Sequence, residues 1–165
     1  MARTREGRFI DAINKLLPKE IHHESCTTPF RGGTPDQYYE SDGGVVRIEY
    51  KYVNAQTLPK NIDLGNSKKP YGLSPKQNAW LTRAFYNNVT VAVIIGSKTE
   101  TMLFTSPLYW TRVWRRDTFL LAPWIDRPRD INPEEAYYGV VDGKATTHYI
   151  MNRHDIVAWI IERVT

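Results

Sequence analysis

The chain lacks the features that mark disulfide-stabilised, zinc-stabilised and membrane-spanning proteins. Its 165 residues include one cysteine, Cys26, so no disulfide can form within the chain. No Cys/His spacing typical of a structural zinc site is present, and a single thiol favours a reducing cytoplasm. No apolar run approaches the roughly 20 residues that span a bilayer, and residues 1–6 do not resemble a secretory signal. We therefore expect a cytoplasmic protein with no membrane partner.

Repeats and low-complexity tracts are also missing, and the composition is that of an ordinary globular chain. Hydrophobic residues make up 41% and charged residues 24%, which predicts a single domain over residues 1–165. The formal net charge of +4 permits an anionic partner without requiring one. The aromatic content of 12% is high, and these rings either fill a core or stack on bases.

Hydrophobic periodicity predicts three helices. The first covers residues 4–17, because one helical face collects the apolar side chains and Pro18 ends the run. The second starts at Ser74-Pro75, since Ser is a good N-cap and Pro suits the first helical position, and it ends at Asn87-Asn88. The third runs from Asn152 or Arg153 to Arg163.

Four strands are expected between these helices. Residues 35–40 and 45–53 flank the turn sequence Ser41-Asp42-Gly43-Gly44, which predicts a hairpin. Residues 89–95 are nearly all apolar, as in a central strand covered on both faces, and residues 101–105 form its neighbour. The order of elements predicts an α/β fold with a mixed sheet.

The remaining segments give weaker patterns. Residues 19–34 and 54–72 are expected to be irregular, and the second is a long loop of the kind that often carries function. The dipeptide Asp142-Gly143 predicts a hairpin over residues 137–150. Residues 107–124 are aromatic and basic. Within them, Arg112 to Arg116, with Trp110 and Trp114 interleaved, form either a DNA-contact element or a helix that buries Trp and exposes Arg.

One strand places charged side chains together. Along residues 45–53, Arg47, Glu49 and Lys51 share one face because strand side chains alternate. Pairing with the preceding strand would bring Asp36 close to Glu49 and Lys51. The face is either solvated, with a cross-strand ion pair and Asp36 as a turn residue, or it is a site.

These residue types suit phosphodiester hydrolysis. Two neighbouring carboxylates repel each other, and a divalent cation such as Mg²⁺ relieves that repulsion. The cation can lower the pKa of a bound water, and a nearby lysine can neutralise the scissile phosphate.

The same residues resemble a known signature. Gly33-Thr34-Pro35-Asp36 followed by Ile48-Glu49-Tyr50-Lys51 resembles the motif of the PD-(D/E)XK nuclease superfamily. The stretch from Leu73 to Leu81, followed by Val91-Ala92-Val93, looks like the VRR-NUC branch, the virus-type replication-repair nucleases. The resemblance covers roughly residues 30–96. It implies a restriction-endonuclease-like core over about residues 1–105, with a central mixed sheet flanked by helices, and an extension over 106–165 for DNA contact or oligomerisation.

The resemblance also implies roles for individual residues. Asp36, Glu49 and the backbone carbonyl of Tyr50 would hold Mg²⁺, with Mn²⁺ expected to substitute, and Lys51 would be the catalytic lysine. Gln77 would support the site, although Ser74-Pro75-Lys76-Gln77 is also a capping box. An acidic residue from the first helix would join them, with Glu6 the better candidate and Asp11 the poorer, although a helix start also favours Glu6 electrostatically.

The function expected from these patterns is a metal-dependent DNA endonuclease, phage-encoded and site-specific, of the restriction or homing type, in the cytoplasm of a bacterial or phage-infected cell. One alternative is a structure-specific Holliday-junction or flap nuclease of recombination and repair. Another is a non-catalytic DNA-binding module on a nuclease fold. A homodimer or higher homo-oligomer is expected, since cutting both strands often needs two copies. The cations expected to contact DNA are Lys60, Lys68, Lys69, Lys76, Arg112, Arg115 and Arg116.

Overall fold

The computed structural model describes residues 4–26, 33–115, 139–141, 144–146 and 150–165. Its helices are α1 (Arg5–Asn14), α2 (Pro75–Tyr86), α3 (Pro107–Trp110) and α4 (Arg153–Val164). Its strands are β1 (His22–Ser25), β2 (Gln37–Ser41), β3 (Gly44–Tyr52), β4 (Asn61–Asp63), β5 (Val91–Gly96), β6 (Thr101–Phe104), β7 (Val113–Arg115), β8 (Gly139–Val141), β9 (Lys144–Thr146) and β10 (Ile150–Met151).

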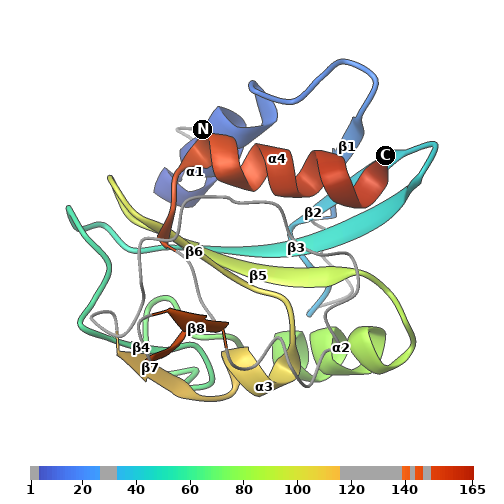
Figure 1. Cartoon of the computed structure of the whole chain (residues 1–165). Coiled ribbons are helices and arrows are strands. Elements are labelled where there is room, and N and C mark those ends of the chain that lie inside the picture. The colour runs from blue at the N-terminus through green and yellow to red at the C-terminus, as the bar shows by residue number, and fades with distance from the viewer. Residues whose placement is uncertain (1–3, 27–32, 116–138, 142–143, 147–149) are drawn as a thin grey trace.

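A six-stranded mixed sheet forms the centre of the fold, in the order β1-β2-β3-β5-β6-β10 (Figure 1). The β3–β5 pair is parallel, with Glu49 opposite Val93, and the other pairs in this sheet are antiparallel. Two further pairs, β4–β7 and β8–β9, lie apart from it. The expected α/β class with a central mixed sheet and flanking helices is therefore confirmed.

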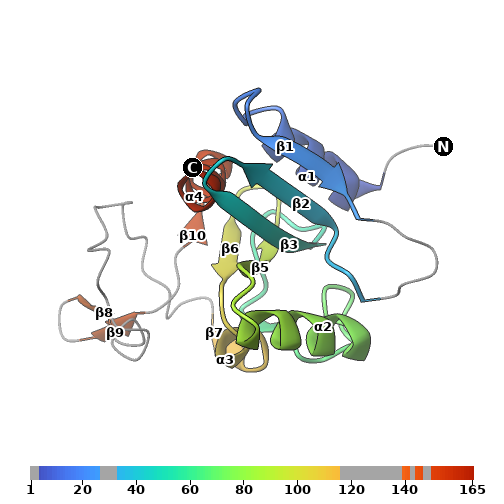
Figure 2. The same ribbon diagram turned by 90° about the vertical axis from the view of Figure 1, so that its right-hand side faces the viewer.

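Helices cover both faces of this sheet. In Figures 1 and 2, α1 and α4 lie on one face, and α2 and α3 lie on the other. Each layer closes over its own hydrophobic cluster. One contains Phe9, Ile13, Ile48 and Tyr50, and the other contains Leu81 of α2. Every residue of β5 is buried, as predicted for a strand covered on both sides.

The predicted hairpin and helix starts are confirmed. β2 and β3 pair antiparallel, with Ser41 opposite Gly44. The Ser74 side chain caps α2 in a capping box, and Asn152 caps α4 in the same way. The first helix ends at Asn14 instead of residue 17, and Leu16 beyond it is 39% exposed.

Several expected irregular segments contain strands. β1 lies within residues 19–34 and all its side chains are exposed, so it has no hydrophobic alternation to detect. β4 lies within residues 54–72. That loop packs closely, because Leu58, Ile62 and Leu64 are buried in the α2-side cluster.

For residues 110–116, the helix alternative is found in part, and the DNA-contact alternative stays a prediction. The four-residue helix α3 buries Trp110, and β7 then pairs with β4. Residues 116–124 lie outside the described residues. β8 and β9 pair as the predicted hairpin, although its turn, Asp142-Gly143, also lies outside them. Among the described residues, none of the helices has the length and apolar character needed to cross a membrane.

Candidate active site

The charged face of β3 turns toward α2 and is buried there. Val46, Ile48 and Tyr50 point into the α1–α4 cluster, so the intervening residues point to the opposite face. Glu49 on that face has no exposed surface. A solvated strand face is therefore excluded at this position.

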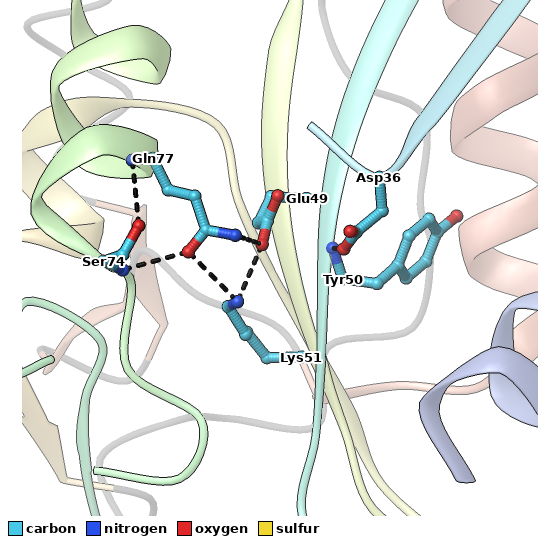
Figure 3. Close-up of polar contacts among 6 residues, drawn as sticks. All are labelled: Asp36, Glu49, Tyr50, Lys51, Ser74 and Gln77. Carbon is cyan, nitrogen blue, oxygen red and sulfur yellow. Dashed lines mark hydrogen bonds and ion pairs between the residues drawn. The ribbon is translucent and has the colours of Figure 1, made fainter. Parts of the chain in front are cut away.

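Glu49 is held by two partners through one carboxylate oxygen (Figure 3). Lys51 Nζ lies 2.7 Å from Glu49 Oε1, and the Lys51 side chain is only 13% exposed. Gln77 Nε2 donates a hydrogen bond to the same oxygen. Glu49 Oε2 is buried and has no hydrogen-bond partner among the described residues. A buried carboxylate oxygen without a partner is costly.

Gln77 makes the contacts that both interpretations of it require, in the cap of α2 and with Glu49. Its backbone N–H donates to Ser74 Oγ at 3.2 Å, and its Oε1 accepts from the Ser74 N–H at 2.9 Å, which completes the capping box. Its Nε2 remains free to reach Glu49, while Lys51 Nζ donates to its Oε1 at 3.3 Å. The start of α2 thus fixes the orientation of Gln77 toward Glu49 and Lys51.

Asp36 lies just before β2 and binds the edge of β3. β2 begins at Gln37 opposite Ile48, so Tyr50 lies past the end of the β2–β3 pairing. The Tyr50 N–H donates to Asp36 Oδ2 at 2.9 Å in place of a strand partner (Figure 3). The N–H and C=O of one strand residue point to the same edge, so the Tyr50 carbonyl faces the Asp36 side of β3.

Glu6 of α1 lies close to the same edge. Its carboxylate interacts with the backbone N–H of Tyr52 and is close enough to Asp36 and Lys51 for their charges to affect its pKa. The structure thus brings together Glu6, Asp36, Glu49, Lys51 and Gln77 from four separate segments.

Gly33 keeps the segment before Asp36 close to α2. Its φ of +105° suits glycine, and a Cβ there would lie 2.8 Å from the carbonyl carbon and oxygen of Lys76. The close approach of these two segments brings Asp36 and the start of α2 to the same site.

The carboxyl groups of the site resist ionisation. Burial raises the pKa of Glu49 to about 8, and the charges of Asp36 and Glu6 add to this effect. The Lys51 ammonium lowers the pKa of Glu49, but it does not offset burial and the two acidic neighbours. Burial also raises the pKa of Asp36, although the hydrogen bond from the Tyr50 N–H and the charge of Lys51 lower it. The pKa of Glu6 is raised by burial and by the charge of Asp36.

These groups fit a divalent cation. Burial and mutual repulsion disfavour their charged forms, and a cation between them would relieve both. Within the described part of the chain, no three His, Cys, Asp or Glu side chains form a metal-binding group by themselves. Two carboxylates, a backbone carbonyl and water are nevertheless a usual ligand set for Mg²⁺.

The cations expected to contact DNA are not gathered at the site. The side chains of Lys60, Lys68, Lys69, Lys76 and Arg112 are all exposed. Lys76 adjoins Gln77 at the start of α2, whereas the others belong to the segments around β4 and β7. Only the backbone of Arg115, in β7, is described, and Arg116 lies outside the described residues.

One neighbour of the site, Arg47, has no role predicted from the sequence. The Arg47 guanidinium lies 5.4 Å from the ring centroid of Tyr38 and 5.6 Å from that of Trp80. These contacts link β2, β3 and α2 on the face that carries Glu49, where they hold the sheet and the helix together. The alternation of β3 placed Arg47 on this face, but its aromatic partners come from separate elements.

Comparisons with known proteins give little further information. No protein-family model and no curated protein matches the chain. Among solved structures, Hjc from Archaeoglobus fulgidus, a Holliday junction resolvase, is similar over 58% of this chain and 74% of its own, with 18% sequence identity and a TM-score of 0.38. A similarity at this level establishes neither family membership nor activity, and the expected place in the VRR-NUC branch stays a prediction. The structure itself defines an α/β protein with a buried carboxylate–lysine centre.

Proposed function

We propose that the chain is a divalent-metal-dependent nuclease that hydrolyses phosphodiester bonds in DNA. The observation that carries this proposal is the buried Glu49, which Lys51 and Gln77 hold through Oε1 while Oε2 has no partner. A purely structural ion pair gains nothing from this arrangement, because the unpaired oxygen adds a desolvation cost. Perturbed titratable groups of this kind are typical of functional sites.

Asp36, Glu49 and the Tyr50 carbonyl would hold the metal, which we expect to be Mg²⁺, with Mn²⁺ able to substitute. When bound, such an ion polarises a phosphoryl oxygen and lowers the pKa of a bound water. The structure supports this assignment through the free Glu49 Oε2 and the Asp36 contact with the Tyr50 backbone.

The other residues of the site position these groups. The Lys51 ammonium, partly exposed beside Glu49, can neutralise charge on a phosphate that approaches the site. Gln77 fixes Glu49 Oε1, which leaves Oε2 for the metal. Glu6 adds negative charge at the Asp36 side and is a further candidate for binding the metal or its waters.

Two kinds of DNA target fit this chemistry equally. A site-specific restriction or homing enzyme would cut long duplex DNA into discrete fragments. A structure-specific enzyme, as the name of the Archaeoglobus protein describes, would ignore duplex DNA and cut four-way or forked DNA. In either case we propose a homo-oligomer that brings two sites to the two strands, with residues 106–165 as the extension that contacts DNA or the second copy.

The test is cleavage of supercoiled plasmid, long linear DNA and a synthetic four-way junction, with Mg²⁺ or with EDTA. We expect wild-type protein to cut in Mg²⁺ alone, Lys51→Ala to lower the rate by about 100-fold or more, and exposed Lys19→Ala to leave it unchanged. The substrate that is cut selects between the two targets. DNA binding without cleavage of any substrate, together with no binding of Mg²⁺ or Mn²⁺, would support the non-catalytic module instead.

A further inference from the structure

A basic hollow lies beside the proposed site, where none of the expected DNA-contact residues is found. Its volume is about 440 Å³, and its cationic lining consists of Arg5, Arg8, Lys98 and Arg153. Tyr52 and Asn54, at and beyond the end of β3, also line it. The starts of α1 and α4 and the turn between β5 and β6 carry these cations, and Figure 1 shows these segments at one end of the sheet.

The four cations of this basic hollow have no acidic partner in the described part of the chain. None of them forms an ion pair with a described carboxylate, and no acidic side chain lines the hollow. Of the acids near these cations in sequence, Glu100 accepts a hydrogen bond from the Leu58 N–H at 2.8 Å, and two others also have contacts. Asp155 accepts a hydrogen bond from the Asn152 N–H at 2.8 Å in the cap of α4, and Glu6 interacts with Asp36, Lys51 and the Tyr52 backbone.

The fold gathers these cations from three distant segments. Arg5 and Arg8 lie on one face of α1 together with Phe9, at helical spacing. Arg153 begins α4, with its guanidinium 6.0 Å from the Phe9 ring centroid, and Lys98 lies in the β5–β6 turn. Like charges around a concave surface repel one another and focus a positive potential, which a bound anion relieves.

The basic hollow and the proposed site meet at the end of β3, where Tyr52 lines the hollow on the α1–α4 face and Lys51 belongs to the site on the α2 face. Tyr52, which lines it, follows Tyr50 by two residues, a distance of about 7 Å along an extended strand. Glu6 interacts with the Tyr52 backbone from one side, and Arg5 and Arg8 flank Glu6 in α1. A strand of DNA that places one phosphate at Lys51 would bring a neighbouring phosphate to this distance.

We propose that the basic hollow binds backbone phosphates of the DNA strand that is cut, a few ångströms beyond the scissile bond. This inference rests on the proposed nuclease function and deepens it, because it names where the substrate strand runs. The strand would pass from the α2 side of β3, over its end, to the starts of α1 and α4. Its ligands are phosphodiesters, so the contact would not depend on base sequence.

The test is duplex binding in EDTA, measured by fluorescence anisotropy over a range of KCl concentrations, so that no cleavage takes place. The variant Arg8→Gln/Lys98→Gln/Arg153→Gln removes three exposed cations of the hollow. Its control, Lys15→Gln/Lys19→Gln/Arg83→Gln, removes three exposed cations elsewhere and has the same net charge. Thermal unfolding confirms that both variants are folded.

We expect the hollow variant to bind duplex DNA at least about tenfold more weakly at low salt. The slope of log K against log salt concentration should be less steep by about 2 to 3, because each phosphate contact on duplex DNA contributes about 0.9 to that slope. The control should change the slope by less than about 1. Equal losses in both variants would show a general charge effect and would overturn the proposal, as would a wild type that binds no DNA.

The two proposals fail separately. If the wild type cuts DNA and the hollow variant keeps the wild-type affinity and salt slope, the proposal for the hollow is wrong and the nuclease proposal stands. Wild type that binds DNA through the hollow, cuts no substrate and binds neither Mg²⁺ nor Mn²⁺ would support the hollow as a phosphate site and overturn the nuclease proposal. Duplexes with 5′-hydroxyl ends and with 5′-phosphate ends should bind equally well. If the wild type prefers the 5′-phosphate duplex and the hollow variant loses that preference, the hollow binds a terminal phosphate and not internal ones.

Discussion

The side-chain amide of Gln77 donates a hydrogen bond to Glu49 Oε1, from the first turn of α2 to the centre of the sheet. The opposite end of the same amide, Oε1, accepts from the Ser74 N–H and from Lys51 Nζ. The amide therefore links the helix cap to the carboxylate–lysine pair. A residue that stabilises the start of α2 therefore also holds Glu49 in place.

Gln77→Glu should separate these two functions. A glutamate at this position can still accept from the Ser74 N–H, but it cannot donate to Glu49 and it adds a negative charge beside it. We expect cleavage to fall by about 10- to 100-fold, the range seen when residues that orient metal ligands are lost, and the pKa of Glu49 to rise further. Single-turnover rates in Mg²⁺ give the first result, and carboxyl titration by NMR gives the second.

Ser74→Ala is the matched control, because it weakens the cap and leaves Gln77 Nε2 in place. It removes the Oγ that accepts from the Gln77 N–H. We expect a stability loss of about 1 kcal/mol with a change in rate much smaller than that of Gln77→Glu. Equal rate losses in the two variants would mean that Gln77 acts only through the helix.

Asp36→Asn should weaken metal binding without opening the edge of β3. An asparagine Oδ1 can still accept from the Tyr50 N–H, which Asp36 Oδ2 accepts at 2.9 Å. The negative charge is lost, so calorimetric titration should give a Kd for Mn²⁺ at least about tenfold weaker than that of the wild type. Because Asp36 raises the pKa of Glu49, that pKa should fall in the variant. Exposed Asp42→Asn should match the wild type, and unchanged Mn²⁺ affinity in Asp36→Asn would remove Asp36 from the metal site.

Much of this site follows from local sequence, and the rest does not. The period-2 alternation of β3 placed Glu49 and Lys51 on one face, and the hairpin turn brought Asp36 to them. The burial of Glu49 depends on α2 packing over that face, and no local pattern indicates it. A Glu–Lys pair of this kind also occurs on protein surfaces, so it is the burial of Glu49, and not the residue type, that distinguishes this pair from a surface ion pair.

Other features of the structure were not predicted, for similar reasons. β1 pairs through its backbone while all its side chains are exposed, so hydrophobic alternation is absent. The basic hollow forms from cations more than a hundred residues apart, and each of them resembles an ordinary solvated charge in the sequence. The lysines of residues 54–72 were identified because they cluster in sequence, and their contact with DNA stays a prediction; the burial of the loop's apolar residues in the α2-side cluster was not predicted.

Glu49→Gln should flatten the dependence of stability on pH. The pKa of Glu49 is about 8 in the folded protein and near 4.5 when unfolded, so the folded state holds its proton more tightly. Stability is therefore greatest below the unfolded pKa, and it falls as the pH rises toward the folded pKa, by an amount on the order of a few kcal/mol. Glutamine does not titrate, so the loss of stability with rising pH should be smaller in the variant. The raised pKa values of Asp36 and Glu6 should leave a smaller dependence of stability on pH, with the same sign.

Denaturant unfolding in EDTA between about pH 5 and about pH 8 measures this effect. The slope with pH is the proper readout, because Glu49→Gln also leaves Lys51 without its carboxylate and so shifts the whole curve. Parallel curves for wild type and variant would show that the Glu49 pKa is not raised. Added Mn²⁺ should recover the wild-type stability that is lost at high pH, and should do so much less in Glu49→Gln.

Gly33→Ala should loosen the site from the side of α2. An alanine Cβ would lie 2.8 Å from the Lys76 carbonyl, and φ at this position is +105°, which a non-glycine residue adopts only with strain. The segment that leads into Asp36 must then move away from the start of α2. We expect a loss of about 1 to 3 kcal/mol in the free energy of unfolding and weaker Mn²⁺ binding, because Asp36 and Glu49 are no longer held together.

Gly65→Ala is the control, since its Cβ would meet Thr111 at an ordinary 3.4 Å. Loss of stability with unchanged Mn²⁺ affinity in Gly33→Ala would mean that the approach of Gly33 to Lys76 supports the fold and does not position Asp36.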